Sequence, residues 1–212
     1  MNDFIKLSNI SKSFSHYKNL RVLKKLTYNF KLGKIYSLMG PSGSGKSTLL
    51  NLLSLIDKPS SGSILIEDKL INFNDKNRND ILRAKNIGII YQQDNLLPDF
   101  TAMENIYLAS LAAGNNKDTS ISKAKNLLKK VKLLNRSNHY PSELSGGEKQ
   151  RISIARALIN DPKIILADEP TGSLDLNTAK EIFQILKNQI NSKRLIIFAT
   201  HNRFFANKSD CL

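Results

Sequence analysis

GPSGSGKS at residues 40–47 is the stretch that decides the fold of this chain. An apolar run at 35–39 precedes it and an apolar-periodic stretch at 46–56 follows it, so it joins a predicted strand to a predicted helix. In that context the glycines let backbone N–H groups turn inward around phosphates, and the helix N-terminus adds a favourable dipole. The sequence therefore predicts a phosphate-binding loop formed by Gly40, Pro41, Ser42, Gly43, Ser44, Gly45, Lys46, Ser47 and Thr48.

Two side chains of this loop carry specific chemistry. Lys46 supplies a cation to the β- and γ-phosphates of a nucleotide. The hydroxyl of Ser47 suits Mg²⁺, which takes few protein ligands beside phosphate oxygens and water.

An apolar strand that ends in two acids lies further along the chain, as IILADE at residues 164–169. In a parallel sheet, ligands bind beyond the carboxyl ends of the strands. We therefore expect Asp168 to reach the Mg²⁺ shell and Glu169 to polarise an attacking water as a general base. Alone, such a strand end is more often simply solvated, but the phosphate loop upstream favours the catalytic interpretation.

The segment LSGGEKQR at residues 144–151 is the most specific one in the chain. A Ser-Gly-Gly turn that opens a helix exposes several N–H groups and a hydroxyl, so Ser145, Gly146 and Gly147 form a second candidate anion site. By itself, an ordinary helix cap would explain this turn. Because the chain already has one phosphate cradle, a second one needs a purpose.

With these motifs in this order, the chain resembles the ABC ATPase family over essentially its whole length, and residues 144–151 are similar to the family's signature motif. The resemblance identifies Gln92 with the glutamine that touches Mg²⁺ and water, and His201 with the histidine that contacts the γ-phosphate. It places Asp175 in the D-loop, near the nucleotide. It also implies that an aromatic ring stacks on adenine, at Phe14 or at the competing Tyr17.

The resemblance further implies a homodimer in which two chains pack head to tail. Each ATP is then held by Lys46 and Ser47 of one chain and capped by Ser145 and Gly147 of the other, which gives two equal composite sites. On this interpretation Glu169, His201 and Gln92 are catalytic, Ser47, Gln92 and Asp168 surround the metal, and ATP and Mg²⁺ are the ligands.

Within the family, residues 96–105 (LLPDFTAMEN) resemble the ATPases that power release of lipoproteins from the bacterial inner membrane. Macrolide-type exporters and a nucleotide-gated cell-division scaffold are the alternatives. All of them imply integral membrane permease subunits as partners, a peripheral position on the cytoplasmic face of the inner membrane, and no nucleic acid. We expect residues 92–114 to receive the membrane partner through an apolar cluster of Leu96, Leu97, Phe100 and Met103, unless these residues only pack the insertion onto the core.

Short apolar strands that alternate with helices predict an α/β fold with a mostly parallel core sheet, here that of a P-loop NTPase. We expect one nucleotide-binding domain over residues 1–212. Its core comprises 1–92 and 144–212 and includes an N-terminal antiparallel β subdomain, and its inserted helical subdomain spans 93–143. The expected strands lie at 5–14, 22–30, 35–39, 63–67, 87–91, 163–167 and 195–199, and the expected helices include 46–56, 146–159 and one that presents Ala124, Leu127, Leu128, Val131 and Leu134 on one face.

Composition sets limits on these interpretations. The net charge of +14 comes from scattered lysines and fits a solvated surface better than a nucleic-acid or lipid-headgroup site. Cys211 is the single cysteine, which excludes a disulfide framework and favours a reducing, cytoplasmic setting. No apolar run approaches the ~20 residues that span a bilayer. Relatives usually continue with another strand and hairpin, so the chain is either naturally short or truncated.

Overall fold

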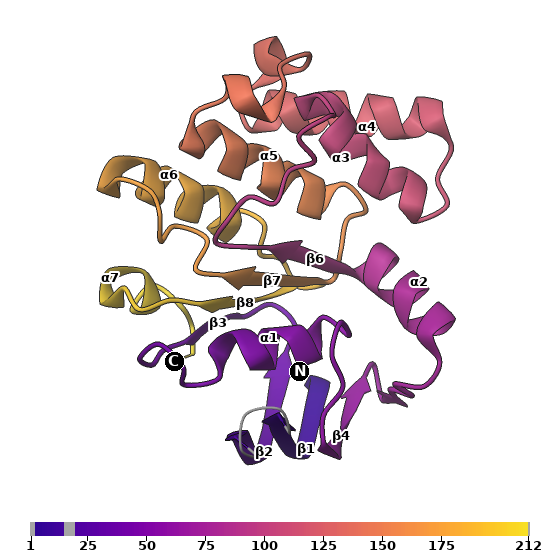
Figure 1. Cartoon of the computed structure of the whole chain (residues 1–212), viewed down its shortest axis with the longest axis vertical. Helices are drawn as coiled ribbons and strands as arrows, with labels where there is room; N and C mark the ends of the chain where they lie inside the picture. Colours follow the sequence, from indigo (N-terminus) through magenta and orange to yellow (C-terminus); the bar gives the residue numbers. More distant parts are fainter. Residues whose placement is uncertain (1–2, 15–19, 212) are drawn as a thin grey trace.

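The computed structural model describes residues 3–14 and 20–211 as two sheets and a layer of helices (Figure 1). A parallel sheet lies in the middle, and helix α1 (Lys46–Leu53) separates it from an antiparallel sheet. Helices α3 (Ala102–Ala112), α4 (Lys117–Lys130) and α5 (Gly146–Leu158) lie on the opposite side. This arrangement confirms the predicted fold class.

The parallel sheet has four short strands in the order β3-β8-β7-β6, which are β3 (Ile35–Leu38), β8 (Leu195–Ala199), β7 (Ile164–Asp168) and β6 (Ile87–Ile90). Alternate residues of β7 belong to different cores: Ile164 and Leu166 face the core that includes α1, whereas Ile165 and Ala167 face the core of α5 and α6 (Leu176–Lys187). Both faces of the sheet are therefore covered, which explains why its strands are continuously apolar.

The antiparallel sheet has the order β2-β1-β4-β5, which are β2 (Leu20–Lys31), β1 (Asp3–Phe14), β4 (Ser61–Ile66) and β5 (Lys69–Leu70). The strands predicted at 5–14 and 22–30 are β1 and β2, which pair with each other, with β2 at the edge of the sheet. The pairing of β1 with β2 shifts register on both sides of Lys12. Such bulges bend a strand and redirect its side chains.

The helical layer has its own apolar core. Helix α3 begins with a capping box, in which the Thr101 hydroxyl accepts the N–H of Glu104 at 3.3 Å and the Glu104 carboxylate accepts the N–H of Thr101 at 2.8 Å. Helix α5 contributes to two cores. One contains Ile152, Ala155 and the C-cap residue Ile159, which pack with α3 and α4. The other contains Ile154 and Leu158, which pack on the parallel sheet.

The structure departs from prediction at the end of α4. The predicted apolar face ran through Leu134, but α4 ends at Lys130, and Lys132 has a φ of 61°, a left-handed conformation that terminates a helix. Leu134 lies in the following 3-10 turn (Leu134–Arg136) and is 38% exposed.

Three further features complete the chain. Helix α2 (Lys76–Asn86) was not predicted, and it begins where the Asp75 carboxylate accepts the N–H of Arg78. Helix α7 (Arg203–Ala206) is short, and after it the carbonyl of Cys211 accepts the N–H of Ser37 beside β3. In the parts of the chain that the structure describes, no helix has both the length and the apolarity to cross a membrane.

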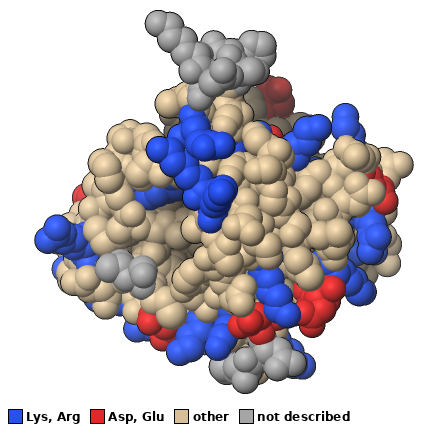
Figure 2. Space-filling model, turned by 90° about the horizontal axis from the view of Figure 1, so that it is seen from below, with Lys and Arg blue, Asp and Glu red and all other residues tan. Residues whose placement is uncertain are grey.

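Surface charge is distributed rather than concentrated. Figure 2 shows lysines and arginines standing in separate groups over one face, with acidic side chains between several of them. This view agrees with the expectation of a solvated basic surface.

A candidate nucleotide-binding site

A cavity of about 640 Å³ lies where the loop after β3 meets the carboxyl ends of β7 and β8. It brings together residues that are far apart in the sequence and that were predicted to bind or cleave a nucleotide. Its lining comprises Phe14, Leu20, Val22, Ser42, Gly43, Gly45, Lys46, Ser47, Thr48, Gln92, Asp168, Glu169 and His201. The three predicted catalytic side chains and the three predicted metal-shell residues are all among them.

The phosphate-loop backbone requires glycine at two points. Gly40 has a φ of 156°, and a Cβ built there would lie 2.6 Å from the Ser44 hydroxyl. Gly45 has a φ of 94° and caps α1, and a Cβ there would lie 3.0 Å from both Val22 and Leu23. The loop can therefore curl tightly, and the first N–H groups of α1, which lack acceptors within the helix, are available to an anion.

Lys46 is held inside the curl of this loop. Its ammonium donates to the carbonyl of Gly40 at 2.8 Å and to that of Pro41 at 3.0 Å. Gly40, Pro41 and Ser44 do not line the cavity but shape the loop, since the N–H of Ser44 also donates to the Pro41 carbonyl. The cation is thus positioned before any ligand arrives.

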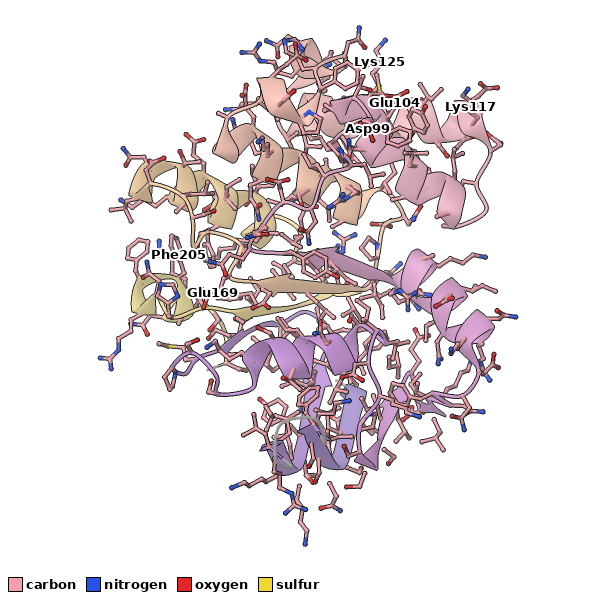
Figure 3. All side chains as sticks on the ribbon, viewed as in Figure 1. Asp99, Glu104, Lys117, Lys125, Glu169 and Phe205 are labelled. Atoms are coloured by element: carbon pink, nitrogen blue, oxygen red, sulfur yellow. The ribbon has the colours of Figure 1, made fainter. Side chains whose placement is uncertain are left out.

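The edge of the cavity that carries Glu169 and His201 is formed by two paired strands. Strands β7 and β8 run in register, with Asp168 opposite Ala199, so the residues that follow each strand meet. The Glu169 carboxylate lies 3.0 Å from Nδ1 of His201, and the N–H of Glu169 donates to the carbonyl of Ala199. Figure 3 shows Glu169 at this edge of the sheet, beside α7 and its Phe205.

Glu169 has an unusual backbone, with a φ of 47°. Left-handed conformations are uncommon for residues with a side chain and occur often at functional sites. The side chain is only 14% exposed, whereas that of His201 is 68% exposed. The carboxylate is therefore sheltered and aimed into the cavity, while the histidine remains accessible to a ligand.

Gln92 follows β6. Its side chain lies close to the loop after β7, as the spacing at Gly172 in that loop shows: a Cβ added at Gly172 would lie 3.3 Å from the side-chain amide nitrogen of Gln92. Helix α5 holds the backbone around Gln92. The Gln150 amide donates to the carbonyl of Tyr91 at 3.1 Å, and the Arg156 guanidinium donates to the carbonyls of Asp94 and Asn95 at 2.7 and 2.8 Å. Burial lowers the pKa of Arg156 from its ordinary value, although the group remains charged at neutral pH.

The apolar end of the cavity is formed by Phe14, Leu20 and Val22. Leu20 lies opposite Phe14 in the β1–β2 pairing. Sequence reasoning missed Leu20 and Val22, although the predicted hairpin contained the signal, since a strand paired with β1 must place side chains beside Phe14. Tyr17, the competing candidate for the adenine platform, lies outside the described residues.

Besides Gly40, Pro41 and Ser44, four predicted nucleotide-binding residues do not line this cavity: Ser145, Gly146, Gly147 and Asp175. Ser145 caps α5 in a capping box with Glu148, and its N–H and hydroxyl hydrogen bonds lower the pKa of Glu148. Asp175 caps α6 by accepting the N–H groups of Asn177 and Thr178. Hydrogen bonding from the Thr178 side chain, and then from the Thr178 N–H, lowers the pKa of Asp175. In this chain both segments act as helix caps.

The side chains that the cavity contains fit a magnesium nucleotide. Mg²⁺ commonly uses one or two protein oxygens together with phosphate oxygens and water. Ser47 and Asp168 offer a hydroxyl and a carboxylate to the same cavity that Lys46 lines. The polar end can therefore hold a metal-bound triphosphate while the apolar end holds a base.

Comparisons with known proteins agree with this geometry. Residues 23–172 match the family model described as ABC transporter. The chain is 43% identical to the lipoprotein-releasing system ATP-binding protein LolD of Rickettsia bellii, over 100% of this chain and 94% of the relative. It is 44% identical to the LolD protein of Ehrlichia chaffeensis, over 99% of this chain and 90% of the relative.

Solved structures give the same picture. The dimeric ATP-binding cassette MJ0796, in a post-hydrolysis state with ADP and Pi, superposes with a TM-score of 0.89 at 37% identity, covering 97% of this chain and 91% of that one. The conclusion is that this chain belongs to the ABC transporter family, as one of its ATP-binding, ATP-hydrolysing subunits.

Proposed function

We propose that this chain binds Mg-ATP in the cavity, hydrolyses it as a dimer of two copies, and thereby drives membrane subunits that release lipoproteins from the bacterial inner membrane. One observation carries the proposal: the phosphate loop, Gln92, Asp168, Glu169 and His201 line one cavity, whereas the Ser145–Gly147 turn lies outside it. The turn is then free to serve the nucleotide of another copy.

The roles of the polar residues follow from their chemistry. Lys46 and the N–H groups at the start of α1 bind the β- and γ-phosphates, and Ser47, Asp168 and Gln92 surround Mg²⁺. When bound, Mg²⁺ supplies positive charge that stabilises the negative charge developing on the phosphate oxygens.

Glu169 acts on the water. Its carboxylate accepts the proton as the water oxygen bonds to the γ-phosphorus and the bond to the β–γ bridging oxygen breaks, which leaves ADP and phosphate. The exposed ring of His201, held 3.0 Å from that carboxylate, contacts the γ-phosphate and keeps Glu169 aimed at the water.

A second copy completes each site. In an isologous dimer, the Ser145–Gly147 turn of one copy caps the γ-phosphate held by Lys46 of the other. ATP then stabilises the closed pair, because it contacts both copies only when they close, and hydrolysis removes that differential contact. The solved relative with ADP and Pi is dimeric, which supports this arrangement.

Mixing two inactive variants tests the composite site. Lys46→Ala breaks the phosphate loop and Gly146→Asp breaks the turn, where an added Cβ would meet only Leu174, at 3.8 Å. A mixed dimer contains one site with both defects and one intact site, so it should hydrolyse Mg-ATP where neither variant does alone. The measurement is the rate of phosphate release. If the mixture releases phosphate no faster than the separate variants, each site lies within a single copy.

The membrane partner is proposed to dock beside the segment after Gln92. The structure divides the predicted apolar cluster: Leu97 and Phe100 are 45% and 39% exposed, whereas Leu96 and Met103 pack into the core of the helical layer. The alternative, that the cluster only packs the insertion onto the core, therefore holds for Leu96 and Met103 but not for the two exposed side chains. Two exposed apolar side chains next to the Gln92 segment are suited to contact a helix of a membrane protein.

The relatives named as lipoprotein-releasing ATP-binding proteins support lipoprotein release over export of other cargo. The proposal includes a peripheral position on the cytoplasmic face of the inner membrane, where membrane subunits would hold the chain.

A pair of leucine substitutions tests the docking surface. Leu97→Ser should leave the ATPase activity of the isolated chain and its melting temperature unchanged, but reduce stimulation by the membrane subunits that co-purify with it. Leu70→Ser is the matched control, because Leu70 is 62% exposed on β5, in the antiparallel sheet. Equal loss of stimulation in both variants would show that docking does not use Leu97.

A further inference from the structure

Lys12 is a buried lysine whose charge the proposed reaction does not use. It lies near the end of β1 and is 9% exposed, which is rare for a lysine unless its charge is paired. Its ammonium donates to the Asp57 carboxylate at 2.7 Å and to the carbonyl of Lys58 at 2.9 Å. A charge buried at this depth requires partners of this kind.

The same ammonium stands over an aromatic ring. Nζ of Lys12 lies 5.0 Å from the ring centroid of Phe14, two residues further along β1. Residues i and i+2 of a strand point to the same face, so the strand itself places the cation beside the ring. Phe14 is 36% exposed and lines the apolar end of the cavity. A ring has two faces, and with the cation over one of them the other is left to a ligand.

Asp57 connects this cation to the phosphate loop. The N–H of Asp57 donates to the carbonyl of Asn51 in α1, the helix that begins at Lys46. Its carboxylate also accepts the N–H of Lys58 at 2.7 Å, which fixes its orientation. The Phe14 ring, which lines the cavity, is thereby tied through Lys12 and Asp57 to the helix that begins at the phosphate loop.

We propose that Lys12 is a positioning residue for the nucleotide base: it holds the Phe14 ring at a fixed place relative to the phosphate loop, so that base and triphosphate are bound together. This inference rests on the proposed nucleotide site. The cation–π contact restrains the ring, and its pairing with Asp57 restrains the cation. Base stacking on a preordered ring costs less ordering entropy than stacking on a free one.

The test compares two ligands that share a phosphate chain. Lys12→Met keeps the aliphatic stem and removes the charge, and its dissociation constants for ATP and for inorganic tripolyphosphate are measured by calorimetry. ATP should bind about three- to tenfold more weakly, the scale of a cation–π contact, with tripolyphosphate unchanged. Lys12→Arg, which retains a cation, should restore most of the ATP affinity.

The control is Lys6→Met. Lys6 is another β1 lysine whose ammonium pairs with a carboxylate, that of Asp68 at 2.7 Å, but its side chain is 37% exposed. It should change neither affinity. A double-mutant cycle with Phe14→Leu adds a readout that a purely structural lysine would not move: once Phe14 is replaced, Lys12→Met should cost little further ATP affinity.

Two results would overturn the inference by itself. One is a Lys12→Met variant that keeps the wild-type preference for ATP over tripolyphosphate. The other is a variant that binds both ligands more weakly by the same factor and also has a lower melting temperature. That result would mean that Lys12 stabilises the fold in general. A wild-type chain that does not bind ATP at all would instead overturn the proposed site, and this inference with it.

Discussion

Replacing Glu169 with glutamine removes the proposed proton acceptor while changing little else in the cavity. Glutamine has the same length, and its amide oxygen can still accept the N–H of His201, which lies 3.4 Å from the carboxylate. The backbone φ of 47° costs the same with either side chain, because both have the same unbranched CH2 groups at Cβ and Cγ. The substitution therefore isolates proton transfer from packing.

The expected magnitudes separate catalysis from stability. General-base catalysis contributes roughly 10²- to 10⁴-fold to a rate, so phosphate release should fall by about that factor. The pair of Glu169 with His201, whose side chain is 68% exposed, is worth only about 0–1 kcal/mol in water. For a chain of this size that corresponds to at most about 4 °C in melting temperature.

The assay measures phosphate release, ATP affinity and melting temperature on the same preparation. Glu169→Gln should bind ATP as wild type does and should elute as a dimer with Mg-ATP, because the closed state no longer turns over. Glu181→Gln is the matched control: it makes the same chemical change on α6, at a side chain that is 71% exposed. A folded Glu169→Gln variant that hydrolyses ATP within tenfold of the wild-type rate would refute Glu169 as the base.

Three further predictions follow from individual contacts. Lys46→Ala should weaken ATP binding by about ten- to a hundredfold in calorimetry, the value of a charged hydrogen bond, and an unchanged affinity would contradict its role. Gly147→Ala should lower the melting temperature more than Gly146→Ala does, because its Cβ would lie 2.7 Å from a Thr178 methyl carbon, and equal melting temperatures would contradict that contact. Hydrogen bonds hold the pKa of Glu148 below its ordinary 4.5, so the stability that its ionised form contributes is present above pH 4.5 and is lost as the pH falls through the folded-state pKa. Urea unfolding of Glu148→Gln should show a smaller decline in that range, and an identical decline would contradict the assignment.

The polar half of the site could be predicted from the sequence because each motif is local. The residues 40–47 bind phosphate through backbone groups of one loop, and the IILADE strand carries its acids at its own carboxyl end. A parallel sheet then brings separate strand ends together without further information. Asp168 and Glu169 line the cavity for this reason, and Gln92 and His201, which were identified through the family resemblance, line it as well.

The apolar half of the site depends on the pairing between strands, which cannot be predicted from the sequence alone. Leu20 enters the cavity because the β1–β2 register sets it opposite Phe14, and that register shifts on both sides of Lys12. Bulges of this kind have no reliable sequence signature. The same shift lies where Lys12 reaches Asp57, 45 residues away in the chain.

Helix α2 escaped prediction for a different reason. Its sequence, KNRNDILRAKN, has too few apolar residues to show a helical period, and Asn79 is its only buried residue. Such a helix is stabilised by its Asp75 cap and by its neighbours rather than by an apolar stripe. The end of α4 likewise depends on one left-handed residue, Lys132, which propensity alone does not indicate.

Helix α5 connects the signature segment, residues 144–151, to the cavity of the same chain. It begins at the Ser145 turn, outside the cavity, and its Gln150 and Arg156 hold backbone carbonyls on both sides of Gln92. Arg156 is mostly buried and makes charged hydrogen bonds, which are about twice as strong as neutral ones. A ligand that displaces the Gln92 segment must therefore either break these bonds or carry α5 with it. Since α5 also packs against α3 and α4, carrying it moves the helical layer, including the exposed Leu97 and Phe100 at its edge.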